Sequence, residues 1–122
     1  MEEKLITQEQ RLEYYSKLVG SHPEAVLKGD TVPYTSLNGN MYSYLSKDGF
    51  LALRLGKDDR EAFLEKYKTT LVYAYGIIQK EYVTVPDILL QNIAEMKPYF
   101  ELSYRYASSL KPKATAKGKK KD

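Results

Sequence analysis

The fold of this chain is decided by residues 38–55, which read Asn-Gly-Asn-Met-Tyr-Ser-Tyr-Leu-Ser-Lys-Asp-Gly-Phe-Leu-Ala-Leu-Arg-Leu. The pairs Asn38-Gly39 and Asp48-Gly49 are typical of tight hairpin turns, because Asn, Asp and Gly tolerate positive φ angles. The segments before, between and after these turns predict a three-stranded antiparallel meander. Alternation along the last segment places three leucines on the core face of the sheet: Leu51, Leu53 and Leu55.

A helix and an edge strand precede the meander. Thr7 caps the helix, and Gln10 follows three residues later, which is the spacing of a capping box. Residues 31–37 form the strand. Pro33 has no N–H to donate, which indicates that this strand lies at a sheet edge or begins after that residue. Four apolar residues at three- and four-residue intervals form the stripe of the helix: Leu12, Tyr15, Leu18 and Val19.

One helix and two strands follow the meander. Asp58 and Asp59 favour a helix over about residues 57–67, because negative charge in the first turn complements the helix dipole. Two further strands are expected at residues 71–75 and 79–85, on either side of a glycine. Strands joined over so short a distance pair antiparallel.

Helical structure closes the folded part of the chain. Pro86 suits the first position of a helical turn, and Asn92 again begins a capping-box spacing. Pro98 would clash inside a straight helix, so we expect a kink or a restart there, with the last helix running from residue 99 to about residue 110. The segments together predict a two-layer α+β fold of order α-β(3)-α-β(2)-α, with helices on one face of an antiparallel five-stranded sheet.

Composition indicates a single soluble domain. A chain of 122 residues is long enough to bury a core without metal or disulfide support. There is no Cys, which excludes disulfides, thiolate nucleophiles and Fe–S clusters. The N-terminus lacks the apolar run of a secretory signal, and no segment approaches the ~20 apolar residues that cross a bilayer. We expect a cytoplasmic protein with no membrane contact and no cofactor.

The basic excess is confined to the end of the chain. Residues 111–122 carry six Lys and one Asp, a net charge of +5, so the whole chain's +3 leaves −2 on residues 1–110. Residues 1–110 are the expected folded domain and residues 111–122 a disordered tail. Such a tail attracts nucleic acid by counterion release without reading its sequence, and the alternative is a solubility tail. The candidate nucleic-acid-binding residues are Lys111, Lys113, Lys117, Lys119, Lys120 and Lys121.

Candidate catalytic residues are few. His22 is the only His, and no Gly-x-Ser-x-Gly elbow accompanies it, so we interpret it as a surface loop residue. Asp58 and Asp59 point about 100° apart on a helix and cannot act together as general acid and base. No Asp-x-Asp-x-Asp-Gly loop is present to bind calcium. The sequence therefore predicts no catalytic residue and no metal site.

One group of residues is a candidate partner-binding face. Arg54 lies on the outward face of its strand, near Tyr42, Tyr44 or Tyr82, depending on the strand register. An Arg among Tyr rings can stack nucleobases or hold a protein partner. The same residues also build an ordinary cross-strand ladder, so both interpretations stay open.

The chain resembles the N-terminal domain of TfoX/Sxy-type proteins, within a wider set of small α+β domains that includes YjbR-like and YdhG-like proteins. The resemblance covers roughly residues 28–110 and implies the same α-β(3)-α-β(2)-α fold. It implies no agreed catalytic residues, and it associates the chain with regulators of DNA uptake and DNA-binding proteins. The residues that carry it are 38–45, 51–55, 60–63 and 80–86.

These observations favour a non-enzymatic binding or regulatory module that contacts a protein partner or nucleic acid. The alternative is a small-molecule-binding domain or an enzyme with a Tyr/Arg/Lys-lined pocket on the sheet. A homodimer built through a sheet edge or the Tyr-rich face is a third hypothesis.

Overall fold

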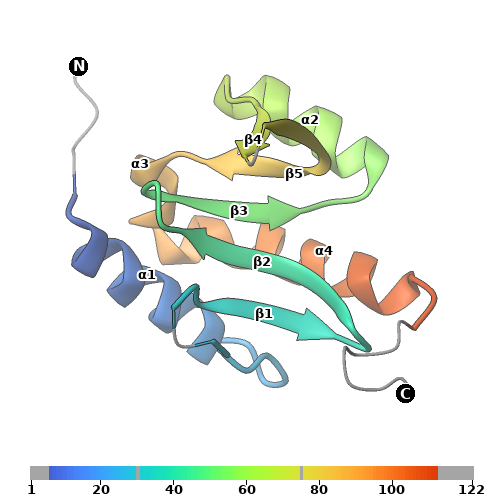
Figure 1. Ribbon diagram of the computed structural model, residues 1–122, viewed down its shortest axis with the longest axis horizontal. Coiled ribbons are helices and arrows are strands. Elements are labelled where there is room, and N and C mark those ends of the chain that lie inside the picture. Colours follow the sequence, from blue (N-terminus) through green and yellow to red (C-terminus); the bar gives the residue numbers. More distant parts are fainter. Residues whose placement is uncertain (1–5, 30, 75, 113–122) are drawn as a thin grey trace.

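The computed structural model describes residues 6–29, 31–74 and 76–112 (Figure 1). The predicted two-layer α+β architecture is confirmed, with α3 as the helical turn expected after Pro86. The elements are α1 (Gln8–Gly20), β1 (Tyr34–Leu37), β2 (Asn40–Ser46), β3 (Phe50–Arg54), α2 (Lys57–Tyr67), β4 (Leu71–Ala74), β5 (Ile77–Val85), α3 (Asp87–Leu90) and α4 (Ile93–Ser109).

The five strands form one antiparallel sheet in the order β1-β2-β3-β5-β4. Its first three strands are the predicted meander. In the first turn φ is 54° at Asn38 and 81° at Gly39, the left-handed geometry that Asn-Gly favours. The second turn places Gly49 at a φ of 94°, just before Phe50 pairs with Ser46. Both hairpins are therefore confirmed.

An irregularity in β2 reverses the side to which one tyrosine points. Thr35 pairs with Ser43, but the next residue along β1 pairs with Met41, so Tyr42 is an extra residue on β2. A β-bulge of this kind shifts the alternation of side chains by one position. Tyr42 is 1% exposed on the helix side of the sheet, with its ring 5.7 Å from that of Phe100.

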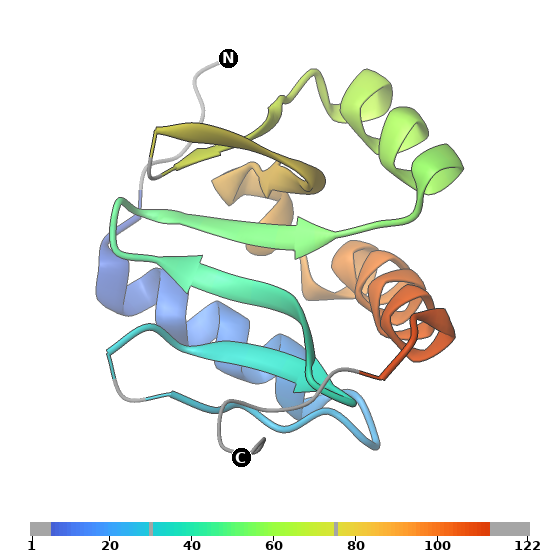
Figure 2. The same ribbon diagram turned by 45° about the vertical axis from the view of Figure 1, so that its right-hand side comes forward.

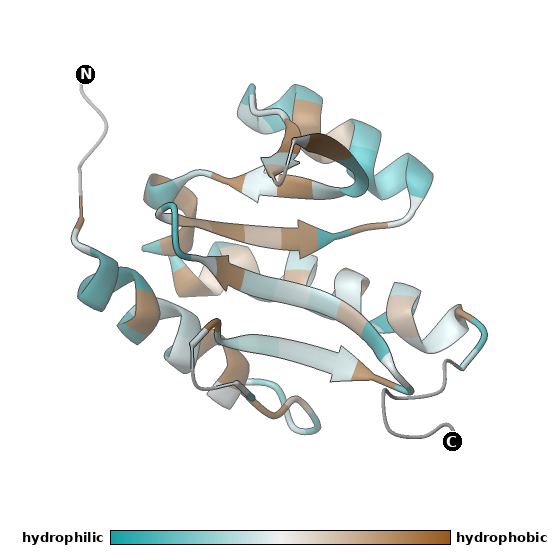
Figure 3. Cartoon of the chain, in the orientation of Figure 1, coloured by the Kyte–Doolittle hydropathy of each residue, from teal (hydrophilic) through white to brown (hydrophobic). Residues whose placement is uncertain are grey.

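The main hydrophobic core lies between the sheet and the helices. The three leucines of the third strand are fully buried in it, as the alternation predicts: Leu51, Leu53 and Leu55. α1, α3 and α4 pack on this face, and α2 joins them through Phe63, whose ring lies 5.1 Å from that of Tyr99. Figure 3 shows the same division, with hydrophobic colour along β3 and hydrophilic colour on the outer turns of α2.

The first helix begins as predicted but buries a different stripe. Thr7 and Gln10 form the complete capping box. Leu12 is 38% exposed, so its place in the predicted core stripe is wrong. Arg11 is buried in its stead, because its guanidinium donates two hydrogen bonds to Asp87 of α3, at 2.9 Å and 2.7 Å. A charge held by such a bidentate pair tolerates burial.

The last helix is continuous, so the predicted restart at Pro98 is wrong. α4 begins at Asn92, whose side chain accepts a hydrogen bond from the backbone N–H of Glu95. Pro98 lies early in this helix and lacks an N–H, which deprives the carbonyl of Ala94 of its helical donor. The packing of α4 on the core outweighs the loss of that single hydrogen bond.

The β4–β5 hairpin curls over the side of the sheet opposite the helices (Figures 1 and 2). Leu71 pairs with Val83, but Val72 pairs with Gln79, so β5 bulges between these positions and bends. The curl covers part of the open face and creates a second, smaller apolar cluster. Its buried members are Tyr44, Ala52 and Val72.

Candidate functional site

The structure brings together three of the four residues predicted for the partner face. The Arg54 guanidinium lies 5.8 Å from the centre of the Tyr82 ring, and the Tyr82 ring lies 5.6 Å from that of Tyr44. These three residues share the open side of the sheet. Tyr42 does not belong with them, because the bulge in β2 turns it into the main core. Its inclusion in the predicted face was wrong.

The polar groups of this face are already engaged within the chain. Arg54 donates to Glu81 at 2.8 Å and to the carbonyl of Met41 at 3.2 Å, and Tyr82 donates to the same carbonyl at 2.8 Å. Tyr44 donates to the side chain of Gln79 at 2.7 Å. These interactions tie β2, β3 and β5 together, as a cross-strand ladder does.

Glu81 of β5 links this ladder to α4, because it accepts hydrogen bonds from Arg54 of β3 and from Tyr106 of α4. Burial opposes its ionisation, but hydrogen bonds from Tyr106 and Arg54 outweigh burial and hold the pKa of Glu81 below its usual value. The carboxylate therefore stays charged beside Arg54 at neutral pH. Arg54 is committed to this partner, so it offers little free charge for an external ligand.

The sequence prediction missed the strongest exposed apolar feature, which is the β4–β5 hairpin. Tyr73 and Ile78 face each other across the two strands and are 68% and 55% exposed. Ile77 is 60% exposed at the tip of the same hairpin. Residues 77 and 78 were expected to lie in the loop, but the turn is tighter and both belong to β5. Two large apolar side chains thus share the outer face of the hairpin, and a third is exposed at its tip.

β4 is also an edge strand without the usual protection. It is the last strand in the sheet order, and the residues Leu71-Val72-Tyr73-Ala74 carry no charge and no proline. Edge strands in soluble proteins are normally blunted by Lys, Pro or a covering loop. β1, at the opposite edge, has such a cover, because Lys28 and Tyr34 exchange two backbone hydrogen bonds. β4 is the more accessible edge for another chain.

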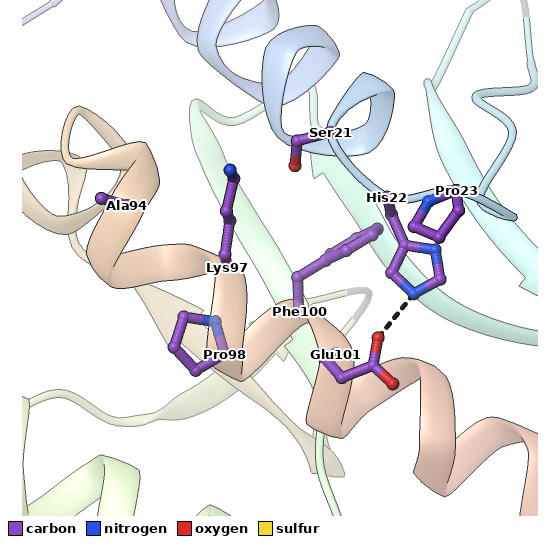
Figure 4. A pocket seen from close by; sticks show the side chains of 8 residues that line it. All are labelled: Ser21, His22, Pro23, Ala94, Lys97, Pro98, Phe100 and Glu101. Atoms are coloured by element: carbon purple, nitrogen blue, oxygen red, sulfur yellow. Dashed lines mark hydrogen bonds and ion pairs between the residues drawn. The ribbon is translucent and has the colours of Figure 1, made fainter.

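His22 lies in the wall of a groove of about 440 Å³ between the end of α1 and the start of α4 (Figure 4). It lies in the loop after α1, as predicted, but its side chain is only 9% exposed, so the expectation of an exposed surface position was wrong. Nδ1 accepts a hydrogen bond from the backbone N–H of Glu24, so the ring proton lies on Nε2, which donates to Glu101 at 2.7 Å. Both ring nitrogens are engaged, which leaves none to accept a proton from a substrate.

The start of the Lys-rich tail is anchored beside the first hairpin turn. The Asn40 side chain, next to the β1–β2 turn, donates a hydrogen bond of 3.1 Å to the carbonyl of Lys111. Lys111 is itself exposed. The other five lysines of the predicted binding tail lie outside the described residues: Lys113, Lys117, Lys119, Lys120 and Lys121.

Comparison with family models, with curated proteins and with known structures found no match to this chain. Within the described part of the chain, no helix is both long and apolar enough to cross a membrane. The described residues also contain no group of three or more His, Asp or Glu side chains arranged to hold a metal ion.

Proposed function

We propose that this chain is a protein-binding module and that the β4–β5 hairpin is its contact element. The observation that carries the proposal is an exposed apolar pair at the edge of the sheet. Tyr73 lies on the unprotected edge strand β4, Ile78 lies beside it on β5, and both are more than half exposed. Exposed apolar groups that gather on one element of a small domain mark interaction surfaces more often than isolated ones do.

Strand addition is the mode of binding that this geometry favours. An extended segment of a partner can pair with the free N–H and C=O groups of β4 and extend the sheet by one strand. Tyr73 would then supply a large, rigid ring with a polar end, which suits a contact surface. Ile78 lies beside it across the hairpin and lengthens the apolar stripe. A second copy of this chain is one form of such a partner, since two β4 edges are self-complementary about a two-fold axis.

The family proposal is compatible with this function. The resemblance to TfoX-type domains rests on the residues quoted above and implies no catalytic machinery. We keep that family, and with it a regulatory role, as a proposal.

Electrostatic contact with nucleic acid through the tail is the second candidate function. It is supported by the segregation of charge, with +5 on residues 111–122 and −2 on the remainder. Six lysines so close together in the sequence neutralise phosphates without reading bases, so this contact would add affinity rather than specificity.

Affinity capture with matched variants tests the leading proposal. The full-length chain, Ile78→Lys and Ile88→Lys are used as baits in nuclease-treated native lysate. Ile88→Lys is the control, because Ile88 is 53% exposed on α3, away from the hairpin. It adds the same charge at an isoleucine of similar exposure. We expect a protein captured by the parent chain and by Ile88→Lys to be lost with Ile78→Lys. Equal capture by all three baits would contradict the proposal.

A further inference from the structure

The groove between α1 and α4 has the size and lining of a small-molecule site. Its volume of about 440 Å³ lies within the ~300–1,000 Å³ range of ligand pockets. Apolar atoms dominate its walls, which include Pro23, Ala94, Pro98 and Phe100. None of these residues contributes to the β4–β5 hairpin, so the groove is independent of the proposed protein contact.

The charges in the groove are not balanced. Glu101 is satisfied, because His22 donates to one of its oxygens and Arg105 to the other, each at 2.7 Å. These hydrogen bonds, with that from Arg105 the largest contribution, lower the pKa of Glu101. For Lys97, in contrast, the structure records no hydrogen bond or ion pair with any described residue. The uncommitted charge of the groove is therefore a single ammonium group.

Figure 4 shows how the lining residues lie relative to one another. The Lys97 side chain extends toward the end of α1 that holds Ser21, whereas the Phe100 ring points toward His22. The Ser21 hydroxyl donates a 2.6 Å hydrogen bond to the carbonyl of Leu18. Its proton is therefore not available to an anion in the groove, which leaves Lys97 as the donor. The Ala94 side chain is small, which leaves room between the two helices.

We propose that this groove binds a small organic carboxylate with a flat apolar body. The carboxylate would pair with Lys97, and a charge-assisted hydrogen bond of this kind is about twice as strong as a neutral one. The apolar body would lie on the two proline rings and Ala94, burying apolar surface on both partners. A neutral ligand of the same shape would lack the ionic contact and bind more weakly.

The test uses phenylacetate as the probe and phenylacetamide as its neutral isostere. Both are titrated at pH 7 into the ¹⁵N-labelled full-length chain, and amide shifts report the affinity and the position of binding. We expect phenylacetate to shift residues of the groove and to bind about tenfold more tightly than phenylacetamide, the difference made by one charge-assisted hydrogen bond. Lys97→Met should abolish this preference, because it keeps the length of the side chain and removes its charge.

Two further variants keep the test decisive. Ala94→Phe fills the groove and should abolish binding of both probes, whereas Lys57→Met on α2 removes an exposed lysine elsewhere and should change nothing. Thermal unfolding of each variant verifies that the fold is retained. The proposal is overturned if phenylacetate shifts no groove residue, if both probes bind equally to the parent chain, or if Lys97→Met retains the preference for the carboxylate.

Discussion

Tyr73 and Ile78 form a cross-strand pair that projects from the edge of the sheet, although both side chains are large and apolar. Their neighbours Val72 and Ala74 point the other way and pack on the second apolar cluster. The hairpin is therefore anchored on one face and unpartnered on the other. This arrangement suits a rigid contact element better than a mobile loop.

The stability of the meander depends on Leu53, which is fully buried in the main core. Leu53→Ala should lower the free energy of unfolding by roughly 2–5 kcal/mol, because it removes buried methyl groups and leaves a cavity. Urea unfolding of both chains measures the difference. Ile88→Ala is the control, since that side chain is 53% exposed and should change stability by less than about 0.5 kcal/mol. A Leu53→Ala effect as small as that of the control would contradict the register of β3.

The ion pair between Arg11 and Asp87 should be worth more than a surface salt bridge. The two side chains are 9% and 14% exposed, and the sequence separates them by 76 positions. Asp87→Ala leaves the buried guanidinium unpaired and should cost about 3 kcal/mol. Thermal or urea unfolding provides the measurement, with Asp58→Ala on exposed α2 as the matched control. If the two variants have the same small effect, the pair does not hold α1 to α3.

Tyr15 should make the protein sensitive to alkaline pH. Its hydroxyl lies 2.7 Å from Ser43 Oγ in the core, and burial raises its pKa well above the usual value. Because the folded state holds the phenolic proton more tightly, this contribution to stability is complete below the unfolded pKa of about 10 and declines as the pH rises above it.

The matched variant for this prediction is Tyr15→Phe. At pH 7 it should be less stable than the parent chain by about 1 kcal/mol, the net value of one buried hydrogen bond. The difference in the free energy of unfolding between the two chains should shrink between pH 10 and 11. Only the parent chain has a buried phenol at residue 15, so only the parent loses stability as that group ionises in the unfolded state. Urea unfolding at pH 7, 9, 10 and 11 tests this. A difference that stays constant with pH would contradict the assigned role of the hydroxyl.

The tail should account for any polyanion binding. Six lysines limit the slope of log K against log salt to about −5, and partial engagement predicts roughly −2 to −4. Duplex DNA binding is measured at several salt concentrations for the full chain and for a chain that ends at Leu110. We expect the shorter chain to bind poorly, because residues 1–110 carry a net charge of −2. Equal affinity of the two chains would place the contact on the folded domain.

The sequence predicted the meander well because its signals are local. Asn-Gly and Asp-Gly turns and the alternation of Leu51, Leu53 and Leu55 act within a few residues, and all were confirmed. The side on which Tyr42 lies was not predictable in this way. It depends on a bulge in the pairing of β1 with β2, and strand register is a tertiary property.

The candidate sites were harder to predict from the sequence for the same reason, since they depend on contacts between distant parts of the chain. Arg11 pairs with Asp87 of α3, and His22 pairs with Glu101 of α4, and both partners are distant in the sequence. The apolar hairpin was missed because Ile77 and Ile78 follow a glycine and resemble a loop-to-strand junction. An excess of exposed apolar surface becomes visible only when burial is known.

Hydrogen exchange tests the proposed protein-binding role of the hairpin most directly. Amide exchange is measured by mass spectrometry for the full-length chain alone and saturated with the protein that it captures. The proposal predicts slower exchange in the peptides that span residues 71–78, because strand addition protects the edge amides of β4, and no change in α2. Protection confined to α1 and α4, with unchanged exchange at residues 71–78, would contradict the central claim.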